Sequence, residues 1–112
     1  MLLTGLLGYS QEQPLSKIAM DDIRYMREEE KMARDVYDSM YIRWQLTPFK
    51  NIQQSETMHM KFMKELIEKY QLTDPVLSEE RGSFSNKQIL SLYQQLIEMG
   101  SKSAIDALKA GA

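Results

Sequence analysis

The stretch PFKNIQQSETMHMKFMKELIEKY, residues 48–70, decides the fold of this chain. It begins with Thr47 as an expected N-cap and Pro48 at the first helical position, and nothing after them breaks a helix. Its apolar residues recur at intervals of three and four, the period of one buried helix face. The expected seam consists of Phe49, Ile52, Glu56, His59, Met63, Leu66 and Tyr70, flanked by Met60, Phe62 and Ile67.

A second uninterrupted helix is expected immediately before this stretch, at residues 18–44. It contains no proline or glycine, and its apolar positions again alternate by three and four. Only a short connection near Gln45 separates the two helices, so they should pack as an antiparallel hairpin. The expected seam of the first helix consists of Ile23, Met26, Glu30, Ala33, Tyr37, Met40 and Trp44. Glu30 therefore falls where an apolar side chain would normally lie.

The rest of the chain predicts shorter helices that pack against this hairpin. Residues 71–82 are polar and contain an Asp-Pro breaker, which indicates a loop. The sequence SNKQ at 85–88 has the form of a capping box, and the helix that it starts should end at Gly100. A last short helix is expected at about 102–109.

The chain is predicted to form one small domain. Its 112 residues suffice for three or four helices around a modest core. We place a flexible lead-in at residues 1–17 and a single helical domain at 18–112. The fold class is all-α, an antiparallel helical hairpin followed by one or two shorter C-terminal helices.

The composition excludes several classes of function. The absence of cysteine rules out disulfides, cysteine-based zinc sites, iron–sulfur clusters and thiol catalysis. A net charge of -2, with basic residues interleaved among acids, argues against nucleic-acid binding. The apolar start of the chain lacks a basic region and is interrupted by Gly5 and Gly8, so it fails as a signal peptide. We expect no membrane association and a cytoplasmic location, with export left open if the start has been trimmed.

Glu30, Glu56 and His59 are the candidate metal ligands. Two carboxylates that are buried on facing helices need a cation or a proton to balance them. Residues three apart share a helix face, so Glu56 and His59 can reach one ion, and Glu30 can reach it from the opposing helix. The pattern typical of a dimetal bundle is a Glu from each of two helices and a Glu-x-x-His from each of two others. This chain, with its single histidine, supplies half of that set.

The charged residues next to Glu30 in the sequence are not expected to be metal ligands. Glu28 and Glu29 project away from the seam and are expected to be solvated. Arg27 and Arg34 lie three and four residues from Glu30 and could fold back towards it. The seams themselves contain no lysine or arginine. A divalent cation is therefore the better candidate for balancing the carboxylates.

The positions of the three residues along their helices do not match in level. If the turn centres near Leu46, Glu30 lies about sixteen residues before it, and Glu56 and His59 lie about eleven residues after it. At a rise of about 1.5 Å per residue, their levels differ by roughly 8 Å. All three residues can meet only if the connection is asymmetric or the first helix ends earlier.

Two segments resemble a known superfamily. EKMARDVY at residues 30–37 resembles the first ligand helix of rubrerythrin and ferritin-like proteins, and SETMHM at 55–60 resembles their second. The wider stretch, about residues 20–110, is similar to a ferritin-like family known only as a domain of unknown function. The resemblance implies a ferritin-like fold and a carboxylate-bridged di-iron site, with Glu30, Glu56 and His59 as ligands. It identifies no catalytic residue.

The departure from that family concerns the second half of the site. Members usually continue into a second helix pair with another Glu and another Glu-x-x-His, whereas this sequence stops at Ala112. Either it is the N-terminal half of a longer protein, or two chains pair. We favour a homodimer, or a higher homo-oligomer, that completes a four-helix bundle and its second set of ligands. A wide apolar face would otherwise be exposed to water.

The expected cofactor is iron, with two ions per dimer, and manganese or zinc are alternatives. Iron bound in this way would support the oxidation of Fe(II) by oxygen or peroxide, so the chain could be a ferroxidase. The rival interpretation is a non-enzymatic helical oligomerisation or binding module. In it, Glu30 pairs with Arg27 or Arg34, and His59 is a hydrogen-bonded residue of the core.

Overall fold

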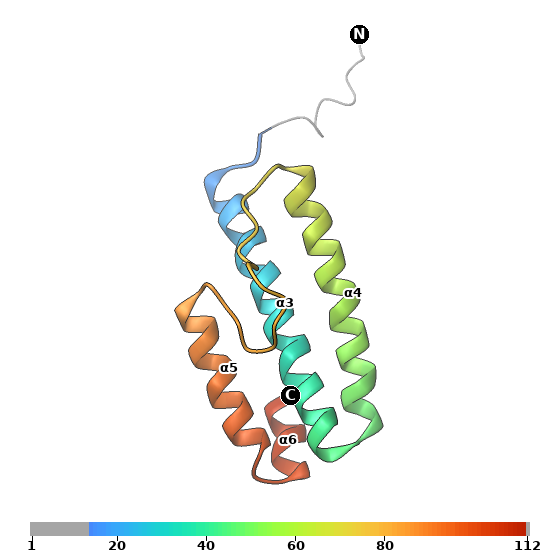
Figure 1. Cartoon of the computed structure of the whole chain (residues 1–112). Coiled ribbons are helices and arrows are strands. Elements are labelled where there is room, and N and C mark those ends of the chain that lie inside the picture. Colours follow the sequence, from blue (N-terminus) through green and yellow to red (C-terminus); the bar gives the residue numbers. More distant parts are fainter. Residues whose placement is uncertain (1–13, 112) are drawn as a thin grey trace.

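The computed structural model describes residues 14–111. This range contains four helices, of which the first two form a hairpin and the last two are shorter. Helix α3 (Lys17–Trp44) and helix α4 (Thr47–Lys69) run antiparallel (Figure 1). Helix α5 (Lys87–Gly100) and helix α6 (Ala104–Gly111) pack against α3. The all-α prediction is confirmed. Most of the predicted lead-in, residues 1–13, lies outside the described residues.

The hairpin connection is one residue tighter than predicted. Helix α3 ends at Gln45, which adopts a left-handed backbone, φ 55°, and donates its N–H to the carbonyl of Tyr41. Leu46 is extended and takes the N-cap position of α4. Thr47 is therefore already helical and makes no cap, while Pro48 still lies in the first turn, where its missing N–H costs nothing.

Local capping side chains set the ends of the shorter helices. Asn86 is the N-cap of α5, and its side chain accepts hydrogen bonds from the backbone N–H groups of Gln88 and Ile89. Helix α6 begins at residue 104, two residues later than predicted. The cause is Ser103, whose hydroxyl accepts the N–H of Asp106 at 3.0 Å and caps the helix there.

The apolar core lies where the four helices meet. It consists of Met32, Val36, Met40, Phe49, Ile89 and Ala107, with aromatic and aliphatic side chains packed around them. Met32 and Met40 of α3 are buried in this core, a role suited to a flexible apolar side chain. Trp44 donates its indole N–H to the carbonyl of Gly100 at 2.8 Å, which joins the end of α3 to the end of α5.

The segment between α4 and α5 is held by a buried charge pair on α3. Lys31 is fully buried, and its ammonium donates to Asp35 at 2.8 Å and to the carbonyls of Glu80 and Ser83. Asp35 also accepts the N–H of Gly82 at 3.1 Å. Each buried charge therefore has a partner, and together they fix residues 80–83 against α3.

Glu28 corrects a prediction made from the sequence. It was expected to be solvated, but its side chain is buried. Its carboxylate accepts the backbone N–H groups of Ser85 and Asn86, just before α5 begins. The N–H of the N-cap Asn86 has no partner within the helix, so Glu28 satisfies a group that the helix leaves free and also fixes the residue before it.

Several apolar side chains of the predicted seams remain exposed. Met26 is 44% exposed and lies one turn from Glu30 on α3. Phe62, 59% exposed, lies one turn from His59 on α4. These positions share a helix face with the candidate ligands. The face that carries the candidate ligands is therefore apolar around them and uncovered in a single chain. Across residues 14–111, no helix combines the length and the apolarity that crossing a membrane requires.

Candidate metal centre

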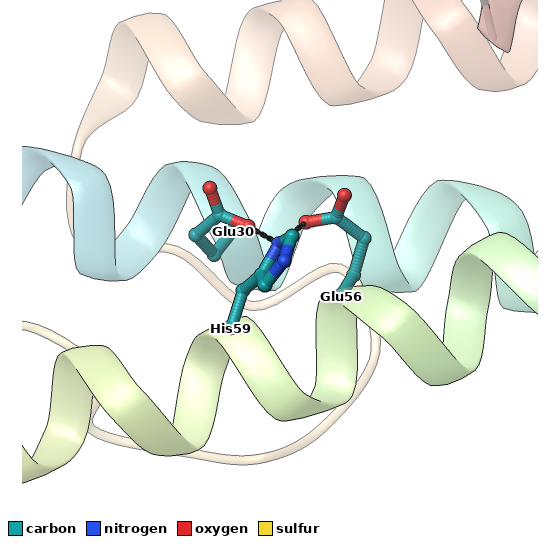
Figure 2. A group of neighbouring side chains, drawn as sticks. All are labelled: Glu30, Glu56 and His59. Atoms are coloured by element: carbon teal, nitrogen blue, oxygen red, sulfur yellow. Dashed lines mark hydrogen bonds and ion pairs between the residues drawn. The ribbon is translucent and has the colours of Figure 1, made fainter.

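Glu30, Glu56 and His59 come together on one face of the hairpin. Figure 2 shows Glu30 projecting from α3 and the other two from α4, with all three side chains directed towards one point. One ligand atom from each residue lies within 4.8 Å of the others. The Nδ1 atom of His59 lies 3.1 Å from Oε2 of Glu30 and 3.5 Å from Oε2 of Glu56. We call these residues the triad.

The level mismatch expected from the sequence does not keep these residues apart. Glu30 lies 14 residues before the end of α3, and His59 lies 12 residues after the start of α4. At a rise of about 1.5 Å per residue, these two differ in level by only about 3 Å. Glu56 starts one turn nearer the connection, and its long side chain bridges that turn. Glu56 and His59 do not lie at one level along α4, so a single offset for both overstates the mismatch.

The triad lies at the edge of the helix interface, which corrects the expectation of a buried seam position. The side chains of Glu30 and Glu56 are 21% and 18% exposed, and that of His59 is 56% exposed. The segment that follows α4 passes behind both helices in Figure 2, so the triad points away from it. The site is consequently open on the uncovered face of the hairpin.

The protonation of Glu56 is shifted by its surroundings. Partial burial, and next the hydrogen bond and negative charge of Glu30, raise the pKa of Glu56 to about 7, although His59 opposes the shift. Burial and the charge of Glu56 also raise the pKa of Tyr37, whose hydroxyl donates to the carbonyl of Gly111. Close to neutral pH, Glu56 is therefore partly protonated, and a cation that binds there would replace that proton.

The arginines next to Glu30 in the sequence are committed elsewhere. Arg27 donates from Nε and Nη2 to the carboxylate of Asp74, at 3.1 Å each. Arg34 pairs with Asp35 at 3.0 Å. The pairing of Glu30 with either arginine, on which the rival interpretation depended, is wrong. His59 is also too exposed to be a core residue.

The donor set and its spacing suit a first-row divalent cation. Ligand atoms about 2.1 Å from such an ion lie about 3.0 Å apart at adjacent octahedral positions and about 3.4 Å apart at tetrahedral ones. The distance from His59 to Glu30, 3.1 Å, falls in that range, and the distance to Glu56, 3.5 Å, lies just above it. Two carboxylates and one imidazole leave further coordination positions open, as a reactive metal requires.

The fold and the site define a class: all-α hairpin proteins with a cluster of two carboxylates and one imidazole between the paired helices. Residues 19–112 match the family described as "Uncharacterized protein domain (DUF2202)", and the chain belongs to that family. The uncharacterized protein MJ0754 of Methanocaldococcus jannaschii is 50% identical over 101 residues, which cover 90% of this chain and 55% of that protein.

A solved structure supports the same relationship. The crystal structure of hypothetical protein MJ0754 matches this chain with a TM-score of 0.86 at 48% identity, over 88% of this chain and 57% of that one. The chain therefore spans little more than half the length of this relative. Neither the family description nor the relative's name states a function, so the ferritin-like assignment and the metal ligands stay predictions.

Proposed function

We propose that this chain is a ferritin-like metal-binding protein and that the triad holds one iron ion of a di-iron pair. The observation that carries the proposal is the convergence of Glu30, Glu56 and His59, with ligand atoms within 4.8 Å of one another. The three residues come from two helices and lie 29 positions apart at the extremes, so the sequence neighbourhood alone does not bring them together.

Iron or manganese suits this donor set better than structural zinc. Structural zinc prefers a closed tetrahedron rich in sulfur or nitrogen, whereas this site offers two oxygens and one nitrogen and stays open. When bound, iron would supply the redox chemistry for the oxidation of Fe(II) by oxygen or peroxide. The chain's own residues would hold the ion, and Glu56 would give up its proton when the ion binds.

The second half of the di-iron site is proposed to come from a second copy of this chain. A two-fold pairing would place two triads face to face and supply the four carboxylates and two imidazoles of a dimetal bundle. The exposed apolar side chains around the triad, among them Met26, Ile52 and Phe62, support such a contact. The longer relative offers another source for these ligands, namely an additional segment of the same polypeptide.

The metal content of purified protein tests the proposal. Protein prepared from iron-supplemented medium should contain about one iron ion per chain. His59→Ala and Glu56→Ala should each lower the content at least tenfold, because each removes one of three ligands. Glu65→Ala is the matched control, since Glu65 lies exposed on α4, two turns from Glu56. A content near zero in the parent, or equal loss in the control, would refute metal binding at the triad.

Oligomeric state tests the second half of the proposal separately. Sedimentation at several protein concentrations should give a dimer, and Phe62→Glu should shift it towards monomer because it places a charge in the apolar contact. Lys64→Glu, on the other side of the same helix, is the control for a change of charge. A monomer that still binds one ion per chain would contradict pairing while leaving the triad as a metal site.

A further inference from the structure

A basic hollow lies between α3 and α4, and none of the triad residues lines it. It measures about 250 Å³ and lies between α3, α4 and the segment after α4. Its lining includes Arg27, Arg34, Lys61, Lys64, Glu79 and Met60. Four cationic side chains and one carboxylate thus surround one space, in a chain whose overall charge is -2. Because three distant segments contribute, no run of basic residues marks the hollow in the sequence.

The cations of this hollow are unequally neutralised. Arg27 has Asp74 as a close partner, and its side chain is only 3% exposed. Arg34 shares Asp35 with Lys31. Within residues 14–111, neither Lys61 nor Lys64 has an acidic partner within 4 Å, and both are exposed. The hollow therefore carries an excess of positive charge that attracts anions.

Among the described residues that line the hollow, Glu79 is the one acid, and it neutralises this positive charge only weakly. One carboxylate oxygen lies 3.3 Å from Nη1 of Arg34, and the other lies 3.8 Å from Nη2 of Arg27. The side chain of Glu79 is 64% exposed, so it can leave without exposing any buried apolar surface. Within residues 14–111, the one hydrogen bond of Arg27 Nη1 goes to the carbonyl of Met60 at 3.5 Å, a long contact that the oxygen of a bound anion could replace with a shorter one.

We propose that this hollow binds a tetrahedral oxyanion of the phosphate class, which displaces the carboxylate of Glu79. The anion would accept hydrogen bonds from Nη1 of Arg27 and Arg34, which stand on a rigid helix with their remaining N–H groups already fixed by acids. Lys61 and Lys64 would approach from α4 as mobile cations. Guanidinium groups held in place by second partners are the donors best suited to phosphate oxygens.

Nuclear magnetic resonance titration with inorganic phosphate tests the site, with sodium chloride at matched ionic strength as the reference. The amide and methyl signals of residues 57–64 and of Glu79 should shift saturably with phosphate and not with chloride. Replacing both Lys61 and Lys64 by Ala should weaken binding about fivefold or more, because two unpaired cations are lost. Replacing Lys50 and Lys69 by Ala removes the same charge from the same helix and should change binding less than about twofold.

Glu79→Gln separates displacement of the carboxylate from general attraction. It removes the competing anion and should tighten phosphate binding about threefold or more, whereas Glu65→Gln changes the charge equally and should not. A parallel titration with adenosine monophosphate distinguishes the source of the phosphate. Equal affinity indicates the free anion, and tighter binding with a shift of the Met60 methyl indicates a phosphorylated organic molecule.

Three results would overturn the proposal: no saturable shift with either compound, equal weakening in the Lys50 and Lys69 control, or unchanged binding in Glu79→Gln. None of these measurements involves a metal. Failure here therefore leaves the triad untouched, and failure of metal binding leaves this site untouched.

Discussion

Replacing Glu56 by Gln should stabilise the metal-free protein while it weakens the proposed metal site. Folding raises the pKa of this carboxyl from 4.5 to about 7. Between these pH values the folded state binds more protons than the unfolded state, so the free energy of unfolding falls as the pH rises. Glutamine is isosteric and cannot lose a proton. The substitution therefore removes the decrease in the free energy of unfolding with rising pH.

The size of the effect follows from the same shift. A carboxyl whose pKa rises from 4.5 to about 7 on folding lowers the free energy of unfolding by about 3 kcal/mol once it is fully ionised. The side chain is 18% exposed, and its charge is shared with Glu30 and His59, so solvent and these neighbours absorb part of that cost. We expect Glu56→Gln to raise the free energy of unfolding by about 1–2 kcal/mol at about pH 8, and by much less at about pH 5.

Urea denaturation of the metal-free protein at both pH values measures this effect. Glu65→Gln is the control, because this exposed residue of α4 should change stability by less than about 0.5 kcal/mol at either pH. The reasoning is refuted if Glu56→Gln destabilises the protein at about pH 8, or if its effect is the same at both pH values. A residue whose replacement increases stability is often kept for function, and the function proposed for Glu56 is the binding of a cation.

Two further predictions concern the scaffold. Asp35→Ala leaves Lys31 buried without its carboxylate and should lower the free energy of unfolding, measured with urea, by about 3–5 kcal/mol. It should also speed hydrogen exchange at Gly82, whose N–H loses its acceptor. Lys31→Met should lower the free energy of unfolding clearly less. Equal costs would contradict the buried-charge argument. Gly100→Ala would place a Cβ against the sulfur of Met40 and should lower stability by about 1–3 kcal/mol, with an unchanged melting temperature as the contrary result.

The sequence predicted the helices well because their ends depend on local signals. The break near Gln45, the polar side chain before α5 and the glycine at residue 100 lie within a few positions of the boundaries that they set. The differences are one or two residues, and each has a local cause, such as the extended Leu46 or the Ser103 cap. The pairing of α3 with α4 followed from the shortness of their connection.

The sequence failed where a partner lies far along the chain. Glu28 looked like one of three solvated acids, but its partners are backbone N–H groups at residues 85 and 86, which no pattern near residue 28 reveals. In the rival interpretation Arg27 or Arg34 paired with Glu30, yet Arg27 pairs with Asp74 of the segment after α4, and Arg34 pairs with Asp35 and with Glu79 of that segment. Charged side chains of α3 thus pair with backbone and loop groups far along the chain, and a sequence pattern near each residue does not reveal these partners.

The triad was found because its spacing is local on one helix and its counterpart lies in register on the next. Glu56 and His59 share a helix face at a separation of three, and Glu30 interrupts an apolar seam. Their exposure was not predicted, because a single hairpin leaves uncovered a face that the seam pattern marks as buried. This difference is itself the reason to expect a covering partner.

Anomalous diffraction at the iron absorption edge, from crystals of protein grown with iron, tests the central claim most directly. We predict one peak per chain about 2.0–2.3 Å from a carboxylate oxygen of Glu30, an oxygen of Glu56 and Nδ1 of His59. A second peak bound by the triad of another copy should lie close by, as in other paired metal sites. The account is contradicted if the density at the triad contains no anomalous peak, or if the iron lies away from these three residues.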